Sequence, residues 1–355
     1  MNRRGFVVGL TALMSARLGA ADYPAVRRGN ALTFPQDHGA HPAFRTEWWY
    51  ITGWVKDAAG NEFGVQVTFF RSRPRVQEDN PSAFAPKQLL FAHAALADPR
   101  LGTLRHDQRA AREGFGLAFA KVGNTDVRLD DWSLRLVGDT YTARIVSRAF
   151  EMTLQFKSTG PVLLEGDRGY SQKGPRASQA SYYYSRPQLA VSGAITIGSM
   201  GSTVVGTAWL DHEWSSEYLA QAASGWDWIG VNFDDGGALM AFRMRARDGG
   251  SAYWAGGTLR DAHGRMRILH PEQIAFVPMR RWRSVRTGVE YPVAMHVRAG
   301  EREIDLTPLM DDQELDARMT TGTIYWEGAV RAAQADMVIG RGYLELTGYW
   351  QPLEL

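Results

Sequence analysis

Residues 48–73, WWYITGWVKDAAGNEFGVQVTFFRSR, decide the fold class. Two runs rich in aromatic and β-branched residues flank a turn at residues 57–61, which is typical of a β-hairpin. Residues 225–246, GWDWIGVNFDDGGALMAFRMRA, have the same form and turn at residues 234–237. Short runs of this kind recur to the end of the chain, and long amphipathic helices are few. The sequence therefore predicts an all-β protein.

The two hairpins resemble each other, and each is followed by another apolar run that ends in Asp. The aligned positions are Tyr50-Ile51 with Trp228-Ile229, Asp57 with Asp235, and Phe70-Arg71 with Phe242-Arg243. A repeat at about half the chain length indicates two copies of one β unit, although hairpins with shared turn chemistry also resemble each other by chance. Because exposed sheet edges invite association, closure of each copy is favoured. We predict two tandem antiparallel β-barrels, in residues 22–195 and 196–355.

Composition limits the function classes. The chain has 355 residues, of which 45% are hydrophobic and 22% charged, and its net charge of +2 excludes the concentrated basic surface of a nucleic-acid-binding protein. The 12 Trp, 13 Tyr and 15 Phe suit a hollow that binds a greasy, unsaturated molecule, and they suit barrel cores equally well. The absence of cysteine excludes thiol catalysis, Cys-ligated metals and a lipid anchor on cysteine.

The N-terminus is typical of an export signal. A basic start with Arg3 and Arg4 precedes a short apolar stretch at residues 6–18 and small residues up to Ala21. We expect cleavage after Ala21 and a mature protein in the periplasm or secreted. The paired arginines favour the twin-arginine route, and an ordinary secretory signal is the alternative.

The stretch TAWLDHEWSSEYL, residues 207–219, sets Asp211, His212 and Glu213 side by side between Trp209 and Trp214. Alternate side chains of a strand share a face, so His212 and Trp214 point one way while the two acids point the other. Adjacent strand residues diverge, so at most two of these ionisable groups reach one ion. No HExxH or second His-x-His pattern exists, and we expect no metal and no cofactor. The G-x-S-x-G mark of a serine hydrolase is also missing from the sequence.

An ordered set of motifs extends from residue 41 to residue 350. It comprises HPAFRTEWWYITG, GDRGYSQKG, SYYYS, AWLDHEWSS, GWDW, YWEGAV and GYLELTGYW. The set resembles the lipocalin-like family of predicted secreted hydrolases of the AttH type, which includes carotenoid 1,2-hydratases. The resemblance implies two lipocalin-like barrels and a cofactor-free addition of water to an isoprenoid double bond. His212 and Trp214 match the His-x-Trp of that family.

Such a hydration needs an acid that protonates the alkene, aromatic faces that stabilise a cation, and a base that positions water. From the resemblance we expect His212 to act as the acid/base or water-orienting group in an apolar cavity walled by Trp214. Asp211 and Glu213 then point away and fix the strand. The hydratases lead us to expect a Tyr-x-Asp pair after the second hairpin, but no acid lies between Asp235 and Asp248.

Two further acids lie among aromatic residues. Glu47 and Asp227 are candidate catalytic groups and candidate partners of His212, and for both the alternative is an ion pair, for Glu47 with Arg45 or Arg71. His93 is interpreted as a satisfied core histidine, and the Gly-rich loop around Lys173 as a turn. The candidate ligand-binding residues besides Trp214 are Trp49, Tyr50, Trp226, Trp228 and Tyr183.

Two function classes remain open. The first is a hydro-lyase or hydrolase that acts without a cofactor on a hydrophobic small molecule or lipid. The second is a non-enzymatic carrier, or a periplasmic partner of a lipid-handling membrane transporter. Both classes need an aromatic hollow, and the sequence separates them poorly.

Overall fold

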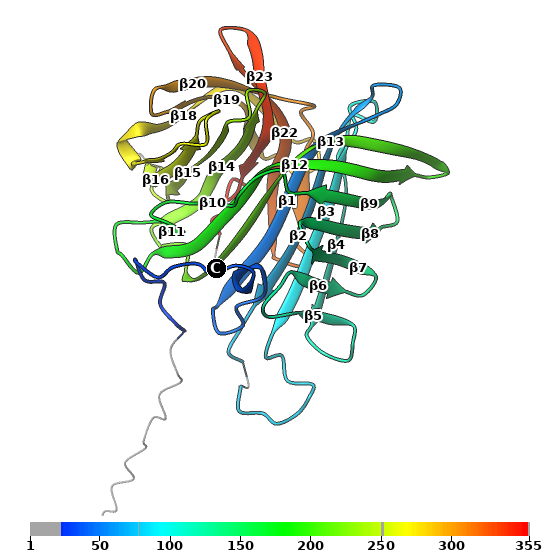
Figure 1. Cartoon of the computed structure of the whole chain (residues 1–355), viewed down its shortest axis with the longest axis vertical. Coiled ribbons are helices and arrows are strands. Elements are labelled where there is room, and N and C mark those ends of the chain that lie inside the picture. Colours follow the sequence, from blue (N-terminus) through cyan, green and yellow to red (C-terminus); the bar gives the residue numbers. More distant parts are fainter. Residues whose placement is uncertain (1–22, 77, 250–251, 354–355) are drawn as a thin grey trace, which may run out of the picture.

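The computed structural model describes residues 23–76, 78–249 and 252–353, so the predicted signal peptide lies outside the described residues. Strands joined in antiparallel pairs make up the described chain, with short 3-10 turns at Gln36–His38 and Pro271–Gln273 (Figure 1). In this part of the chain no helix has the length and apolar character needed to cross a bilayer. The all-β prediction is confirmed.

The first sheet contains 13 strands. They are β1 (Thr46–Asp57), β2 (Glu62–Ser72), β3 (Leu89–Ala97), β4 (Arg105–Arg112), β5 (Ala118–Ala120), β6 (Asp126–Leu129), β7 (Trp132–Val137), β8 (Thr140–Val146), β9 (Glu151–Lys157), β10 (Leu163–Leu164), β11 (Tyr170–Gln172), β12 (Ala180–Ile197) and β13 (Met200–Glu217). Their order is β4-β3-β2-β1-β13-β12-β9-β8-β7-β6-β5, and β10 and β11 pair with β12. Arg109 on β4 donates to the carbonyl of Val146 at the end of β8 (2.9 Å), which draws the distant parts of the sheet together.

The second sheet contains 10 strands. They are β14 (Ala223–Phe233), β15 (Ala238–Ala246), β16 (Ala252–Arg260), β17 (Met266–Leu269), β18 (Ile274–Arg283), β19 (Glu290–Ala299), β20 (Arg302–Pro308), β21 (Glu314–Ala317), β22 (Thr323–Gln334) and β23 (Met337–Leu346). Their order is β17-β16-β15-β14-β23-β22-β20-β19-β18, and β21 pairs with β22. Arg243 on β15 donates to the carbonyl of Phe276 on β18 (2.6 Å), so this sheet also curls on itself.

The two sheets repeat one topology. In each, four consecutive strands form a meander, and the first strand of the meander pairs with the last strand of the unit, β1 with β13 and β14 with β23. The two predicted hairpins, β1–β2 and β14–β15, therefore hold equivalent places, as the sequence repeat indicated. The predicted domain boundary at 195/196 falls inside β12, whereas the chain passes from one sheet to the other between Glu217 and Ala223.

Side chains fill the interior of both barrels. The N-terminal interior contains Trp49, Trp132 and Trp214, and the C-terminal interior contains Tyr291 and Trp326. A third apolar cluster lies between the barrels, where β1, β12 and β13 face β14, β22 and β23 (Figure 1). It is formed by Tyr50, Trp54, Tyr183, Trp209, Trp228, Phe242 and Tyr343 with their neighbours. The central strands are consequently buried on both faces.

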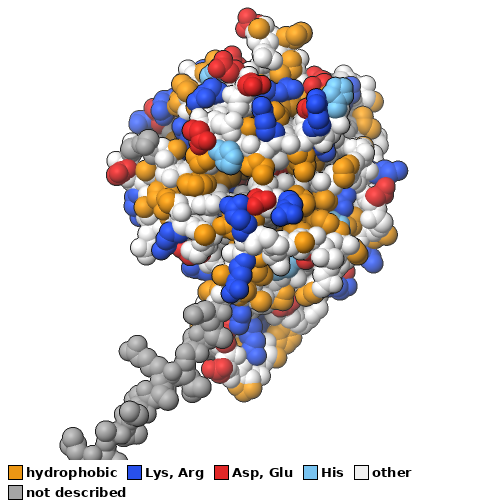
Figure 2. Space-filling view, turned by 60° about the vertical axis from the view of Figure 1, so that its left-hand side comes forward, with side chains coloured by type: hydrophobic (Ala, Val, Ile, Leu, Met, Phe, Trp, Pro, Cys, Tyr) orange, Lys and Arg blue, Asp and Glu red, His pale blue; other side chains and the backbone are white. Residues whose placement is uncertain are grey.

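The surface agrees with the nearly balanced charge of the chain. Figure 2 shows acidic and basic side chains interspersed with hydrophobic ones on the face that it presents.

Candidate functional site between the barrels

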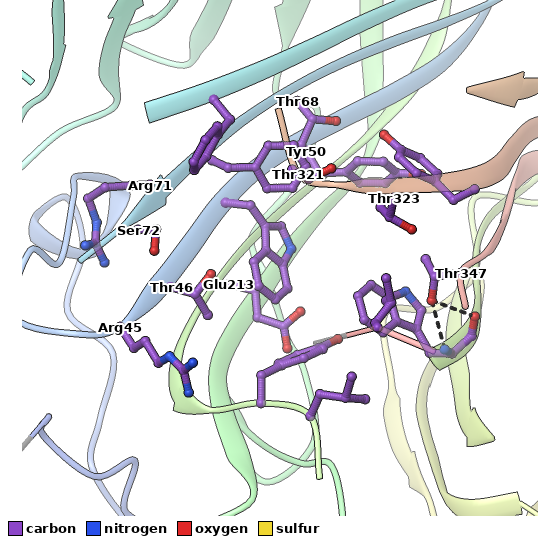
Figure 3. Close-up of a pocket in the computed structure, with 18 of the residues that line it drawn as sticks. Arg45, Thr46, Tyr50, Thr68, Arg71, Ser72, Glu213, Thr321, Thr323 and Thr347 are labelled. Atoms are coloured by element: carbon purple, nitrogen blue, oxygen red, sulfur yellow. Dashed lines mark hydrogen bonds between the residues drawn. The ribbon is translucent and has the colours of Figure 1, made fainter. Parts of the chain in front are cut away.

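A cavity with a volume of about 1140 Å³ lies between the two barrels. Figure 3 shows Glu213 between Arg45 on one side of the cavity and Thr347 on the other. The lining is rich in aromatic and acidic side chains, which are Trp48, Tyr50, Phe70, Phe91, Tyr183, Tyr218, Trp226, Trp228, Tyr325, Asp211, Glu213, Glu217, Glu327 and Glu345. The site is thus a space between two filled barrels.

The register of β1 and β13 determines which side chains enter the cavity. Tyr50 lies directly opposite Asp211, and Trp49 lies directly opposite His212. Directly opposite residues of an antiparallel pair share a face, so Tyr50 and Asp211 face the cavity with Glu213. His212 faces the N-terminal barrel interior. The alternation predicted for this stretch is present, but the expected faces were wrong: the two acids line the cavity, and His212 and Trp214 do not.

His212 belongs to a closed hydrogen-bond chain. Its Nε2 lies 2.9 Å from Glu47 Oε1, and its Nδ1 lies 3.2 Å from the Tyr184 hydroxyl. The same hydroxyl lies 2.8 Å from His38 Nδ1, and Arg186 Nη2 lies 3.0 Å from His38 Nε2.

The Arg186 guanidinium can only donate, and it thereby sets the direction of every bond in this chain. His38 accepts at Nε2 and donates from Nδ1 to Tyr184, which donates to His212 Nδ1, and His212 donates from Nε2 to Glu47. Burial, the largest cause, lowers the pKa of His212, and with the Arg186 charge it lowers the pKa of His38 to about 3. His212 is neutral, and both of its ring nitrogens are occupied.

Glu47 is a fully buried ion-pair partner. Its Oε2 lies 2.7 Å from Arg71 Nε, and its Oε1 lies 2.7 Å from His41 Nδ1. Burial alone would raise the pKa of Glu47, but Arg71 and His41 together hold it well below its usual range. The alternative weighed for Glu47, pairing with Arg71, is the observed arrangement.

Glu47, His41 and His212 also place ligand-type atoms within 4.8 Å of one another. Arg71 already compensates the carboxylate charge, and the second ring nitrogen of His41 lies 3.2 Å from Asp37 Oδ1. Each imidazole therefore has two hydrogen-bonding partners. We interpret the group as an ionic network that holds residues 37–47 against the barrel.

Asp227 repeats the arrangement of Glu47 in the second barrel. It lies directly opposite Arg243, as Glu47 lies opposite Arg71, and its Oδ2 is 2.6 Å from Arg243 Nε. It is fully buried, also contacts Arg245, and accepts a hydrogen bond from Tyr349. Asp227 is therefore ion-paired in the C-terminal barrel and does not reach His212.

The predicted ligand-binding residues divide between the two faces. Tyr50, Tyr183, Trp226 and Trp228 line the cavity. Trp49 and Trp214 lie in the N-terminal core, where Trp49 stacks on His212 at a ring-centroid distance of 4.7 Å. His93 is buried between Tyr325 and Thr320, with both ring nitrogens in hydrogen bonds, in agreement with its interpretation as a satisfied histidine.

Asp211 is held at the cavity wall by three donors. Tyr183 donates to Oδ2 (2.6 Å), and Trp209 Nε1 (2.6 Å) and Ser185 (2.5 Å) donate to Oδ1. Trp228 Nε1 in turn lies 3.0 Å from the Tyr183 hydroxyl, which fixes that hydroxyl from the opposite barrel. Burial raises the pKa of Asp211 to about 7 despite these hydrogen bonds, so this carboxyl exchanges its proton near neutral pH.

Glu327, which is buried, and Glu345, which is half-buried, form a carboxyl pair on the opposite wall. They lie directly opposite each other on β22 and β23, and both line the cavity. Burial is the largest cause that raises the pKa of both groups, that of Glu345 to about 7. The Glu345 charge adds to the shift of Glu327, and the charges of Asp211 and Glu213 add to the shift of Glu345, so protonation of the pair is favoured. Trp226 donates to Glu345 Oε2 (3.1 Å). Glu327 interacts with the Tyr50 hydroxyl, and among the described residues neither group has a hydrogen bond to a further side chain. A buried carboxyl and hydroxyl that have only each other and that face a cavity mark a place for ligand or water.

The charge of Glu213 is compensated by Lys173, which lies in the Gly-rich loop predicted to be a turn. Lys173 is buried with its Nζ 2.8 Å from Glu213 Oε1, and its ammonium lies 4.2 Å from the centre of the Phe242 ring. Burial raises the pKa of Glu213, although Lys173 opposes this shift. Glu327 and Glu345 are further acids of the site that were not predicted from the sequence. Both lie in motifs of apolar and aromatic residues, YWEGAV and GYLELTGYW, as Glu47 does, and that context was the available signal.

The buried acids make stability depend on pH. Burial raises the pKa of Glu165, whose Oε1 lies 2.8 Å from Ser185 Oγ, to about 8. A carboxyl whose pKa is raised by folding stabilises the folded state at low pH, and this contribution is lost as pH rises through the folded pKa. We expect the free energy of unfolding to fall between about pH 5 and pH 8. Glu165→Gln should remove a few kcal/mol of that fall, at about 1.4 kcal/mol per pKa unit. Urea unfolding of both proteins across this range measures the effect, and equal slopes would contradict it.

Comparison with known proteins places the chain in a family. A model of the AttH-like family matches residues 25–349. The crystal structure of an AttH from Nitrosomonas europaea (NE1406) shares 52% sequence identity, with a TM-score of 0.86, over 92% of this chain and 99% of that chain. No match was found among curated proteins.

Two more distant structures share the fold. Kievitone hydratase from Nectria haematococca has 13% identity and a TM-score of 0.70 over 92% of this chain and 96% of that chain. CghA with Sch210972 has 15% identity and a TM-score of 0.52 over 86% of this chain and 89% of that chain. The family match spans both barrels, and the likeness to the Nitrosomonas structure covers nearly all of each chain. The chain belongs to the AttH-like family.

Proposed function

We propose that this protein adds water to a carbon–carbon double bond of an apolar isoprenoid or other lipid held between its barrels, without a cofactor. The observation that carries the proposal is the Glu327–Glu345 pair, two carboxyls that lie directly opposite each other, face an aromatic cavity and have raised pKa values. The likeness of fold to kievitone hydratase, a protein named for a hydration, supports the reaction class. We extend the expectation from the N-terminal sequence and place the mature protein in the periplasm or outside the cell.

The two walls of the cavity differ in the way that acid–base catalysis requires. Glu327 is buried, faces the cavity and has a pKa well above its usual range, so it is the proposed acid. Asp211 accepts three hydrogen bonds that favour its ionised form, so it is the base. Tyr50 lies directly opposite Asp211 and interacts with Glu327, so this ring lies between the proposed acid and the proposed base.

In the proposed reaction Glu327 gives its proton to one alkene carbon, and a cation forms on the other carbon. The faces of Tyr50, Trp48 and Trp228 stabilise this cation. A water molecule adds to the cation and loses a proton to Asp211, so one water is consumed for each double bond. Proton return from Asp211 to the glutamate pair restores the starting state.

Incubation in D2O tests the proposal. The protein is mixed with a panel of neutral and acidic isoprenoids that have terminal double bonds, and the extracts are analysed by mass spectrometry. We expect one ligand to gain the mass of D2O, with one deuterium bound to carbon. If every ligand, including the one that copurifies with the natively exported protein, is recovered unchanged, the protein is a non-enzymatic carrier or a partner of a lipid transporter instead.

A further inference from the structure

The mouth of the cavity carries arginines without acidic partners. The mouth is defined here by the exposed lining residues Arg45, Arg247, Thr321, Gly322, Gln351 and Pro352. Arg45 precedes β1 and Arg247 follows β15, so the two guanidinium groups come from different barrels. Within residues 23–76, 78–249 and 252–353, neither side chain has an ion pair or a hydrogen bond. Two unopposed charges therefore lie at the entrance.

Two neighbouring arginines add to this charge. Arg73 Nε lies 2.6 Å from Glu78 Oε1, and Arg75 Nε lies 3.7 Å from Glu78 Oε2, so both share one carboxylate. Arg75 Nε and Nη2 are shielded from solvent, and in the described chain they have no hydrogen-bond partner. The Cζ atom of Arg75 lies 4.7 Å from the centre of the Tyr23 ring, and both residues line the cavity.

Four acidic residues lie deeper in the same space than the exposed arginines. Asp211, Glu213 and Glu327 are buried and Glu345 is half-buried, and the pKa values of these carboxyls are raised, so ionised groups are disfavoured there. A ligand anion is excluded from that depth for the same reason. Guanidinium groups bind carboxylates and phosphates by paired, charge-assisted hydrogen bonds, so an anion is favoured at the mouth.

We propose that the ligand is amphipathic, with a carboxylate or phosphate group bound by Arg45 and Arg247 and an apolar unsaturated chain that extends inward. A cavity of about 1140 Å³ has room for a long chain in addition to the anionic group. Binding at the mouth fixes how far the chain enters and so selects the double bond presented to Glu327. This last step depends on the proposed hydration, whereas the anion site does not.

A matched pair of fluorescent probes tests the site. cis-Parinaric acid and its methyl ester have the same chain and differ in charge, and Trp48, Trp226 and Trp228 in the cavity wall report binding by energy transfer. We expect the acid to bind more tightly than the ester. The double variant Arg45→Gln with Arg247→Gln should bind the acid about tenfold more weakly and should bind the ester with unchanged affinity. Arg148→Gln, at an exposed arginine outside the cavity, should change neither affinity.

The outcomes separate this proposal from the proposed function. Equal affinities for acid and ester, failure of the acid to bind, or equal losses of both probes in the double variant would overturn the anion site. In those cases, formation of the deuterated product from a neutral isoprenoid would still support the proposed hydration. Conversely, a selective loss of affinity for the acid probe supports the anion site even if no ligand gains water. Displacement of the probe by dodecanoate or by dodecyl phosphate then shows which anion the arginines prefer.

Discussion

Replacing Glu327 with glutamine is expected to lower the rate of water addition by about two to four orders of magnitude, the usual contribution of a positioned general acid. Glutamine has the shape of a protonated glutamic acid but cannot give up a proton to an alkene. The raised pKa of Glu327 favours its neutral form, and the amide likewise introduces no buried charge, so the fold should be retained. The measurement is the yield of the deuterated adduct per minute, with ligand affinity followed separately by fluorescence.

Two variants control this experiment. Glu314→Gln makes the same exchange at a buried glutamate that does not line the cavity. His212→Gln changes the group that sequence reasoning favoured and that the structure places in the barrel interior. Both should retain turnover at temperatures where they are folded. If Glu327→Gln keeps full activity while His212→Gln loses it, the assignment of the acid to the cavity wall is wrong.

Arg71→Met is expected to lower the free energy of unfolding by about 3–5 kcal/mol, because it leaves the buried Glu47 carboxylate without its permanently charged partner. Arg71 is itself buried and also donates to the carbonyls of His41 and Phe44, so the substitution frees several acceptors at once. Methionine keeps much of the side-chain volume, which confines the change to the lost charge and hydrogen bonds. Denaturant unfolding at pH 7 measures the difference.

The double variant Glu47→Gln with Arg71→Met shows whether the loss comes from the unpaired charge. It should be less destabilised than the sum of the two single variants, because no buried carboxylate remains to be compensated. If Arg71→Met lowers the free energy of unfolding by less than about 1 kcal/mol, the loss is no larger than the contribution of a solvent-exposed ion pair. The Glu47–Arg71 pair would then be unimportant for stability.

The fold could be predicted from local patterns. Each hairpin contains its own turn and its own β-forming runs, so short-range information suffices to place β1–β2 and β14–β15. The similarity of the two hairpins also indicated two equivalent barrels, which the strand order confirms. Ion pairs of Glu47 and Asp227 could also be expected from local sequence, because an acid buried among aromatic residues needs a cation nearby.

The face of β13 that enters the cavity could not be predicted. Alternation separates the two faces of a strand, but it identifies the solvent or cavity side only when one face is polar. Here β1 and β13 are buried on both sides, one against the barrel core and the other against the second barrel. Both faces of the Asp211–Trp214 stretch carry an ionisable group beside aromatics, so the composition of the stretch gave no preference.

The Glu327–Glu345 pair could not be predicted from local sequence, because it depends on how distant strands pair. Glu327 and Glu345 lie in separate motifs, and they become neighbours only through the register of β22 with β23. Their opposition to Asp211 further requires that the second barrel pack against the first. Neither relation leaves a local pattern in the sequence.

The proton on the Glu327–Glu345 pair is the central claim, and infrared spectroscopy of protein labelled with carboxyl-¹³C glutamate tests it most directly. At pH 7 the wild type should show the carbonyl band of a protonated, buried glutamic acid that is absent from Glu327→Gln. Glu165, which should remain protonated in both proteins, provides the internal reference. Identical spectra of the two proteins at pH 7 would mean that the pair is ionised, and the proposed acid would not exist.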